Sequence, residues 1–68
     1  MRWEYRGNTL ILGGGLTSRT IPAAYHSVFQ SLKRHKPSEI DLGEVETIDS
    51  AGVAFLDEIH TRLASKGI

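Results

Sequence analysis

Apolar and polar residues follow two different periods along this chain, and the periods predict which segments are strands and which are helices. In residues 2–6 aromatic residues alternate with charged ones, which is typical of a strand with one buried face. Residues 9–12 are β-branched or aliphatic and predict a second strand. Gly7-Asn8 indicates a hairpin turn between the two strands, and the run Gly13–Gly15 is expected to end the second one.

A helical period begins after the glycine run, near Ile21. Thr20 is the expected N-cap, and Pro22 suits the first turn because its missing N–H would find no intrahelical partner there. The basic residues 33–36 suit the negative end of the helix macrodipole, and Pro37 stops the helix. The residues that recur at helical spacing form one apolar stripe: Ile21, Ala24, Tyr25, Val28, Phe29 and Leu32.

The second half of the chain predicts one more strand and one more helix. Glu39–Leu42 is expected to be a short strand with Ile40 and Leu42 on one face and Asp41 on the other. The second helix is expected from about Ser50 to Lys66, with Gly67 directly after its C-terminus. Its predicted apolar face consists of Val53, Leu56, Ile59, His60 and Leu63.

The order of elements predicts an α/β fold, β-β-α-β-α, with a short mixed sheet and helices packed on it. The strand–helix–strand part predicts a right-handed crossover and a parallel pair of strands. Such a sheet leaves an exposed strand edge, and Gly67-Ile68 resembles the start of another strand. We therefore expect either that the chain pairs with another copy, as a homo-oligomer through this edge, or that a C-terminal strand-helix part is missing.

Composition narrows the classes of function. A chain of 68 residues forms one small domain, residues 1–68, and its lack of cysteine excludes disulfides and thiolate metal sites. Eight basic and eight acidic residues cancel, so there is no basic footprint for nucleic acid or anionic lipid. No apolar run approaches the roughly 20 residues that span a bilayer, and the N-terminus lacks a signal-peptide core. We expect a cytoplasmic protein without nucleic-acid partners or direct membrane insertion.

The candidate chemical groups favour ordinary structural roles. His26, His35 and His60 contain no pair at the i, i+4 spacing of a helical metal site. The glycine run lacks the Gly-Lys-Ser/Thr that follows in a phosphate-binding loop. Ser50 stands beside Asp49, but no Gly-x-Ser-x-Gly motif surrounds it and nothing in the sequence places a base nearby. We expect no metal, no cofactor and no catalysis.

The most informative segment runs from Val45 to Leu56, where an extended apolar stretch leads through Asp-Ser-Ala-Gly into the second helix. Asp49 and Ser50 are both preferred capping residues, and simple capping alone would account for the pair. Gly52 removes a side chain where another backbone or a partner surface can approach closely. A hydroxyl at the positive end of a helix could also meet an acidic or phosphorylated partner group.

This segment resembles the signature of STAS domains. In that family a hydrophobic-Asp-hydrophobic strand, here Ile40–Leu42, is followed by a short link, Asp-Ser/Thr-Ser/Ala-Gly and a helix. Leu10–Thr17 is similar to the family's Leu-x-Gly-Glu-Leu-Thr/Asp segment, with Gly14-Gly15 in place of Gly-Glu. The resemblance covers essentially the whole chain. Because a STAS domain normally continues with a strand, a helix and a strand, it also implies that 1–68 is incomplete at the C-terminus.

Two branches of the family bear on function. In anti-sigma-factor antagonists the third motif residue is a serine that a partner kinase phosphorylates, and here that position is Ala51. The small STAS subunits of Mla phospholipid ABC transporters carry Asp-Thr-Ala-Gly, which this chain matches with Ser50 for threonine. The second branch implies a non-catalytic subunit that binds and supports the transporter's cytoplasmic ATPase, peripheral to the inner membrane. The implied partner-binding residues are Asp49, Ser50, Ala51 and Gly52; an antagonist acting by partner switching, with Ser50 as an off-register phosphosite, is the alternative.

Overall fold

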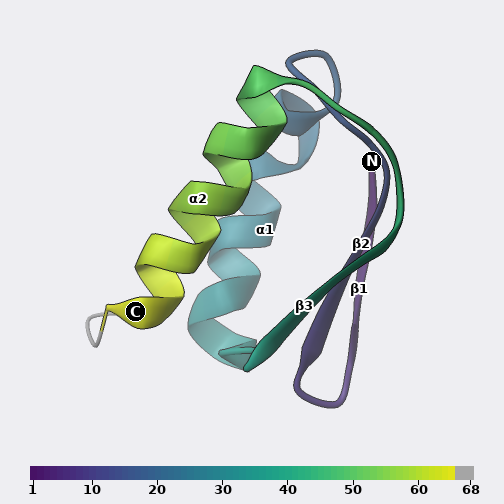
Figure 1. The fold of residues 1–68 in the computed structure, drawn as a ribbon. Helices are drawn as coiled ribbons and strands as arrows, with labels where there is room; N and C mark the ends of the chain where they lie inside the picture. Colours follow the sequence, from purple (N-terminus) through teal and green to yellow (C-terminus); the bar gives the residue numbers. More distant parts are fainter. Residues whose placement is uncertain (66–68) are drawn as a thin grey trace.

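A computed structural model describes residues 1–65 and shows two layers, a three-stranded sheet and a pair of helices (Figure 1). The predictions for Lys66, Gly67 and Ile68 lie outside the described residues. The order β-β-α-β-α is the predicted one, and so is the α/β class. The elements are β1 (Arg2–Arg6), β2 (Thr9–Leu16), α1 (Ile21–His35), β3 (Glu39–Ile48) and α2 (Ser50–Ala64).

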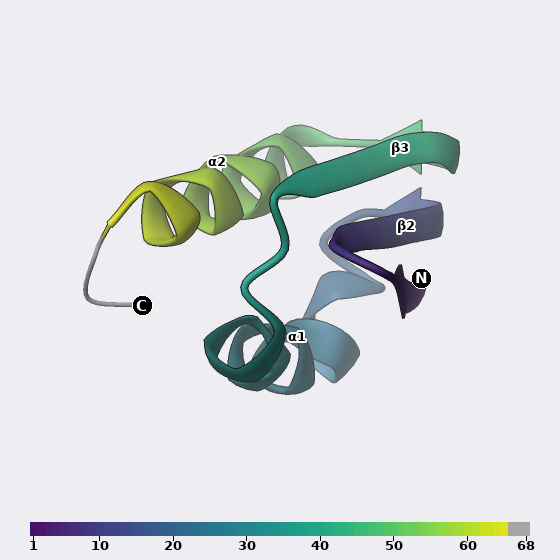
Figure 2. The same cartoon turned by 90° about the horizontal axis from the view of Figure 1, so that it is seen from below.

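The sheet is mixed, as predicted, with β2 in the centre. β1 and β2 form an antiparallel hairpin around Gly7-Asn8, and β2 and β3 are parallel. Both helices lie against one face of the sheet, α1 on the side of β1 and α2 on the side of β3, as the view from below shows (Figure 2). Within residues 1–65 no helix covers the other face of the sheet.

The expected break at the glycine run is wrong, because β2 continues through Gly13–Gly15 to Leu16. Gly14 has φ +75°, a left-handed conformation that glycine adopts at little cost, and the pairing with β3 shifts on either side of it. The strand therefore absorbs its irregularity as a local bulge instead of ending.

The third strand is longer than predicted, because it runs on from Leu42 to Ile48. Ile11 pairs with Asp41 but Gly13 pairs with Glu44, so two residues of β3 oppose one of β2. This bulge turns Leu42 away from the core, and its side chain is 42% exposed. The predicted common face of Ile40 and Leu42 is therefore wrong, and only Ile40 packs against the core.

The first helix has the predicted bounds but not the predicted cap. Thr20 occupies the N-cap position without a side-chain capping bond. Its hydroxyl instead donates to the Gly15 carbonyl oxygen at 2.6 Å and accepts from the Thr17 N–H at 3.0 Å. Pro22 lies in the first turn, as predicted, and Lys36 ends the helix in a left-handed conformation with φ +45°.

The core joins the buried side of β2 to one face of each helix. The α1 stripe is buried or half-buried as predicted, apart from the exposed Tyr25. On α2 the predicted face is partly wrong: Val53 is 59% exposed and His60 is exposed, whereas Phe55, which was not predicted, is buried. The fully enclosed or nearly enclosed core side chains are Leu10, Leu12, Leu16, Ile21, Val28, Phe29, Leu32, Phe55 and Ile59.

Candidate functional site

The carboxyl ends of β2 and β3 and the amino ends of both helices meet at one end of the molecule (Figure 1). In open α/β sheets this end is where binding sites commonly form, because loops and helix N-termini present polar groups there. The segment Asp49–Gly52 lies at this end, beside the loop of residues 17–20 that leads into α1. The four residues implied as partner-binding are therefore at a suitable place, and their environments differ.

Asp49 is held by the protein itself. One carboxylate oxygen, Oδ1, accepts from the Gly52 N–H at 3.0 Å and caps α2. The other, Oδ2, accepts from the Ser18 N–H at 3.0 Å in the loop before α1. The Asp49 N–H donates to the Leu16 carbonyl oxygen at 3.2 Å. Asp49 thus ties the ends of two strands and the starts of two helices together, and its role as helix cap is confirmed.

The same contacts shift the acidity of Asp49. The backbone N–H of Ser18, followed by that of Gly52, favours the ionised carboxylate and lowers the pKa of Asp49 below its ordinary value of 3.8. A group with a lowered folded-state pKa stabilises the fold above its unfolded pKa, and this contribution is lost as the pH falls through the folded value. Asp49 therefore stabilises the domain at neutral pH and not in strong acid.

Replacing Asp49 by asparagine should remove this pH dependence. Wild type is expected to lose part of its stability between about pH 5 and about pH 2, and Asp49→Asn should lose less over the same range because no charge is titrated. The measurement is the urea midpoint of unfolding across that range. Asp57→Asn, at an exposed carboxylate on α2, serves as control and should follow wild type. An unchanged acid response in Asp49→Asn would contradict the role of Asp49.

Gly52 and Ala51 face inward. Gly52 is buried, and a Cβ placed on it would collide with the Leu16 carbonyl oxygen and lie 2.6 Å from Cγ1 of Ile48. Ala51 is half-buried and packs against the core. The close approach expected at Gly52 is thus made by the protein's own backbone.

The exposed part of this end is a small mixed surface, here called the helix-start surface. Ser50 is the first residue of α2 and is exposed, and within residues 1–65 its hydroxyl makes no hydrogen bond. Of the two roles left open for the Ser50 hydroxyl, capping and facing outward, the structure has the outward one, because Asp49 alone provides the cap bond. The helix-start surface consists of Ser18, Arg19, Ile48, Ser50 and Val53, all exposed.

Four of the five members of this surface were missed by the sequence prediction, which names only Ser50 among them. Ser18 and Arg19 lie 31 and 30 residues before Asp49 in the sequence and share no motif with it, so only the fold brings them close. Val53 was assigned to the core, yet it is one of the most exposed apolar side chains of the described chain. The available signal was Phe55, because an apolar stripe through Phe55 leaves Val53 on the exposed side of the helix.

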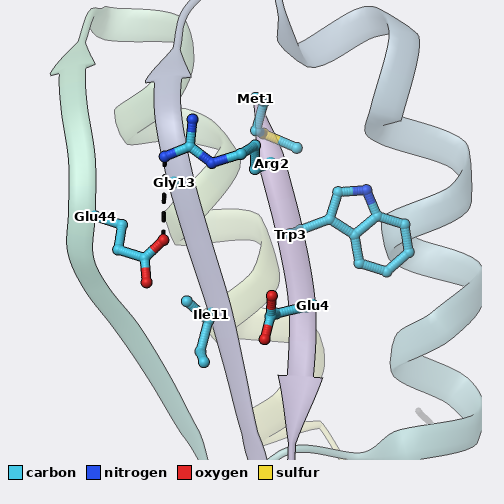
Figure 3. Close-up of a pocket in the computed structure, with 7 residues that line it drawn as sticks. All are labelled: Met1, Arg2, Trp3, Glu4, Ile11, Gly13 and Glu44. Atoms are coloured by element: carbon cyan, nitrogen blue, oxygen red, sulfur yellow. Dashed lines mark ion pairs between the residues drawn. The ribbon is translucent and has the colours of Figure 1, made fainter.

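The histidines and a hollow on the sheet are further features of residues 1–65 that could take part in chemistry. His26, His35 and His60 are all exposed, and residues 1–65 contain no group of three or more side chains placed to hold a metal. A hollow of about 430 Å³ lies on the open face of the sheet (Figure 3). Arg2 and Glu44 reach toward each other across Gly13 there, with 4.0 Å between Nη2 and Oε1, while Trp3 extends toward the helix layer. Such an exposed ion pair contributes little to stability.

Two further findings concern membrane crossing and likeness to known proteins. Across residues 1–65 there is no helix with the length and apolar character that crossing a membrane requires. No known family of proteins, no curated protein and no solved structure matches the chain.

Proposed function

We propose that this chain is a non-catalytic STAS-like subunit that binds and stabilises the cytoplasmic ATPase of a phospholipid-transport ABC system. Two independent features support the proposal. One is the sequence motif Asp49–Gly52 with its preceding strand, and the other is the β-β-α-β-α fold that places this motif at an exposed end of the molecule. The proposed place of action is the cytoplasmic side of the inner membrane, where the ATPase would hold the subunit.

The observation that carries the proposal is that neighbouring residues at the start of α2 face in different directions. Asp49 and Gly52 are used by the fold itself, whereas Ser50 and Val53 point away from it. Val53 is 59% exposed, so the isolated domain leaves this apolar side chain in water at a cost in free energy. The nearby Ser50 hydroxyl makes no hydrogen bond within residues 1–65. A partner that packs on Val53 and accepts from Ser50 would gain from both groups.

The same geometry favours binding over catalysis. A nucleophilic serine needs a base within hydrogen-bond reach and a third group that orients the base. The Ser50 hydroxyl has no such partner within residues 1–65, and both oxygens of the neighbouring Asp49 are engaged by backbone N–H groups. Neither residue is therefore prepared for acyl or phosphoryl transfer.

A regulatory antagonist that acts by partner switching is the second candidate. The observation that favours it is that the Ser50 hydroxyl is exposed at a helix N-terminus, where a phosphate would be electrostatically favourable. Ala51, which occupies the family's phosphoserine position, is half-buried and carries no hydroxyl. In this reading the partner is an anti-sigma kinase, and co-purification with a kinase instead of an ATPase distinguishes the two.

Ser50→Arg is expected to weaken ATPase binding by about 30-fold or more, as loss of a central contact does. The long charged side chain would fill the space in which the partner packs against Ser50 and Val53. Ser50→Thr keeps the hydroxyl and should bind like wild type. The measurement is a pull-down of the ATPase subunit together with the ATPase rate of the assembled complex.

The control is Ser27→Arg, the same substitution at an exposed position on α1. It should leave both binding and the ATPase rate unchanged, and circular dichroism should show that every variant is folded. A folded Ser50→Arg variant that binds and stimulates like wild type would place the interface elsewhere and remove the functional proposal.

A further inference from the structure

The sheet ends on both sides in a strand with a free edge. Within residues 1–65, β1 and β3 each pair with β2 and with no other strand. Each outer edge therefore presents backbone N–H and C=O groups that no neighbouring strand of the described chain satisfies. Free strand edges of this kind are templates for pairing with another chain.

The two edges carry opposite charge patterns. β3 contains four acidic residues and no basic one: Glu39, Asp41, Glu44 and Glu46. β1 reads Arg-Trp-Glu-Tyr-Arg, so Arg2 and Arg6 flank a single Glu4. All of these charged residues are exposed. The net charge of zero for the whole chain thus hides a strongly acidic edge and a weakly basic edge, in which Arg6 is ion-paired with Glu4 at 2.8 Å, on opposite sides of one sheet.

We propose that β3 of one copy pairs with β1 of a second copy, so that the sheet continues from one molecule into the next. β1 is antiparallel to β2 and β2 is parallel to β3, so a second copy in the same orientation brings its β1 antiparallel to β3. This arrangement places the arginines of one copy beside the carboxylates of the other. Opposite charges on neighbouring strands stabilise a pair, and like charges destabilise it.

The charge pattern also selects against the symmetrical alternatives. Pairing β3 with β3 would place two rows of four carboxylates side by side. An antiparallel β1–β1 pair centred on Glu4 would set Arg2 opposite Arg6 and Glu4 opposite Glu4. The β3–β1 combination instead joins the strand of four acidic residues to the strand that carries two arginines.

Apolar contacts act in the same direction. Trp3 and Tyr5 of β1 are half-buried on the side of the sheet that faces the helices. Ile40 and Val45 of β3 are half-buried on that same side. Joining the strands lines up the two pairs in one layer and removes more of their surface from water.

The β3–β1 interface is short and leaves one free strand edge on each outer copy. β1 has five residues, or about 17 Å at about 3.4 Å per residue, so we expect weak association that depends on concentration. Because the contact joins two different surfaces, it produces chains of copies unless the twist of the sheet closes them into a ring. The proposal is independent of the helix-start surface and of the ATPase.

The test is a charge exchange followed by analytical ultracentrifugation at low salt. The first variant makes β1 acidic with Arg2→Glu and Arg6→Glu, and the second makes β3 basic with Glu39→Lys, Glu44→Lys and Glu46→Lys. Each variant alone should associate about tenfold more weakly than wild type, because both of its edges then carry the same sign. An equimolar mixture should restore association, since each basic edge again meets an acidic one.

The control is Lys33→Glu with Arg34→Glu, which changes the net charge as the first variant does but on the exposed surface of α1. It should associate like wild type. Wild type that stays monomeric up to about 1 mM at low salt overturns the proposal. So does a mixture of folded variants that fails to associate while wild type does.

Hydrogen exchange on wild type provides a second measurement that needs no variant. Amide protons on the outer edges of β1 and β3 should become at least tenfold more protected at high protein concentration, and about 0.5 M salt should reverse much of this. Strand pairing would be contradicted if concentration-dependent protection appeared only in α2, or if neither strand edge became more protected.

Discussion

Gly52→Ala is expected to destabilise the domain by about 3 kcal/mol, at the upper end of the cost of overpacking. The added Cβ would collide with the Leu16 carbonyl oxygen and press on the Ile48 side chain. The carbonyl belongs to the central strand and cannot move without displacing β2, so the start of α2 must shift instead. A domain of 68 residues has only a few kcal/mol of stability to lose. The measurement is thermal unfolding followed by circular dichroism.

Gly43→Ala is the matched control for this prediction. A Cβ on Gly43 would meet only Oδ1 of Asp41, at 3.1 Å, and that carboxylate, which accepts from the Gly43 N–H at 2.8 Å, is on an exposed side chain that has room to shift. The control should change stability by about 0.5 kcal/mol or less. Similar midpoints for the two alanine variants would show that Gly52 is not packed against Leu16 as the structure has it.

Phe55→Ala should cost about 3–5 kcal/mol, which is the usual range for a buried phenylalanine. The Phe55 side chain is 3% exposed and meets the Phe29 ring edge-to-face, with 5.6 Å between ring centroids. It is the main aromatic contact between the two helices, so its loss leaves a cavity that α1 and α2 share. Denaturant unfolding at neutral pH measures the effect.

Val53→Ala, two residues away on the same helix, is the control for Phe55→Ala. Val53 is largely exposed, and its truncation should change the free energy of unfolding by about 0.5 kcal/mol or less. The pair also decides between the two possible orientations of α2. If Val53→Ala proved the more damaging variant, the helix would be rotated from the orientation described here.

Local sequence signals predicted the elements well where the residues that carry the signal also determine the local backbone conformation. The alternation in residues 2–6 and the turn at Gly7-Asn8 gave the hairpin. Pro22 and Pro37 fixed α1 because proline limits the backbone wherever it stands. Asp49 was predicted as a cap for the same reason, since a capping side chain bonds to the backbone only three residues away.

Signals that depend on distant neighbours were misread. The glycine run suggested a break, but pairing with β3 keeps Gly13–Gly15 extended across the middle of the sheet. On α2 the apolar residues fit two alternative stripes that could face the core, one through Val53 and one through Phe55. Gly52 decides between them, because only the stripe that begins at Gly52 lets the helix approach Leu16. The sequence identifies no partner for Gly52 and therefore predicts the stripe through Val53, which is wrong.

The candidate site was predicted in part for the same physical reason. The position of Asp49–Gly52 at a helix start follows from the motif alone. That Gly52 faces inward while Ser50 faces outward does not follow from the motif, since it depends on where β2 ends. Nor does the hydrogen bond from Ser18 to Asp49, which spans 31 residues and exists only once the sheet has formed.

The aromatic cluster on the hairpin makes the protein its own optical probe. Trp3 is the only tryptophan, and its ring lies edge-on to Tyr5 with 6.3 Å between centroids. Tyr5 in turn stacks on His35 at 4.1 Å and shares a hydrogen bond with Ser31 at 2.7 Å, so β1 is fastened to the end of α1. Tryptophan emission therefore reports whether the hairpin is docked, without any label, and a red shift that precedes loss of helical signal would reveal that β1 detaches first.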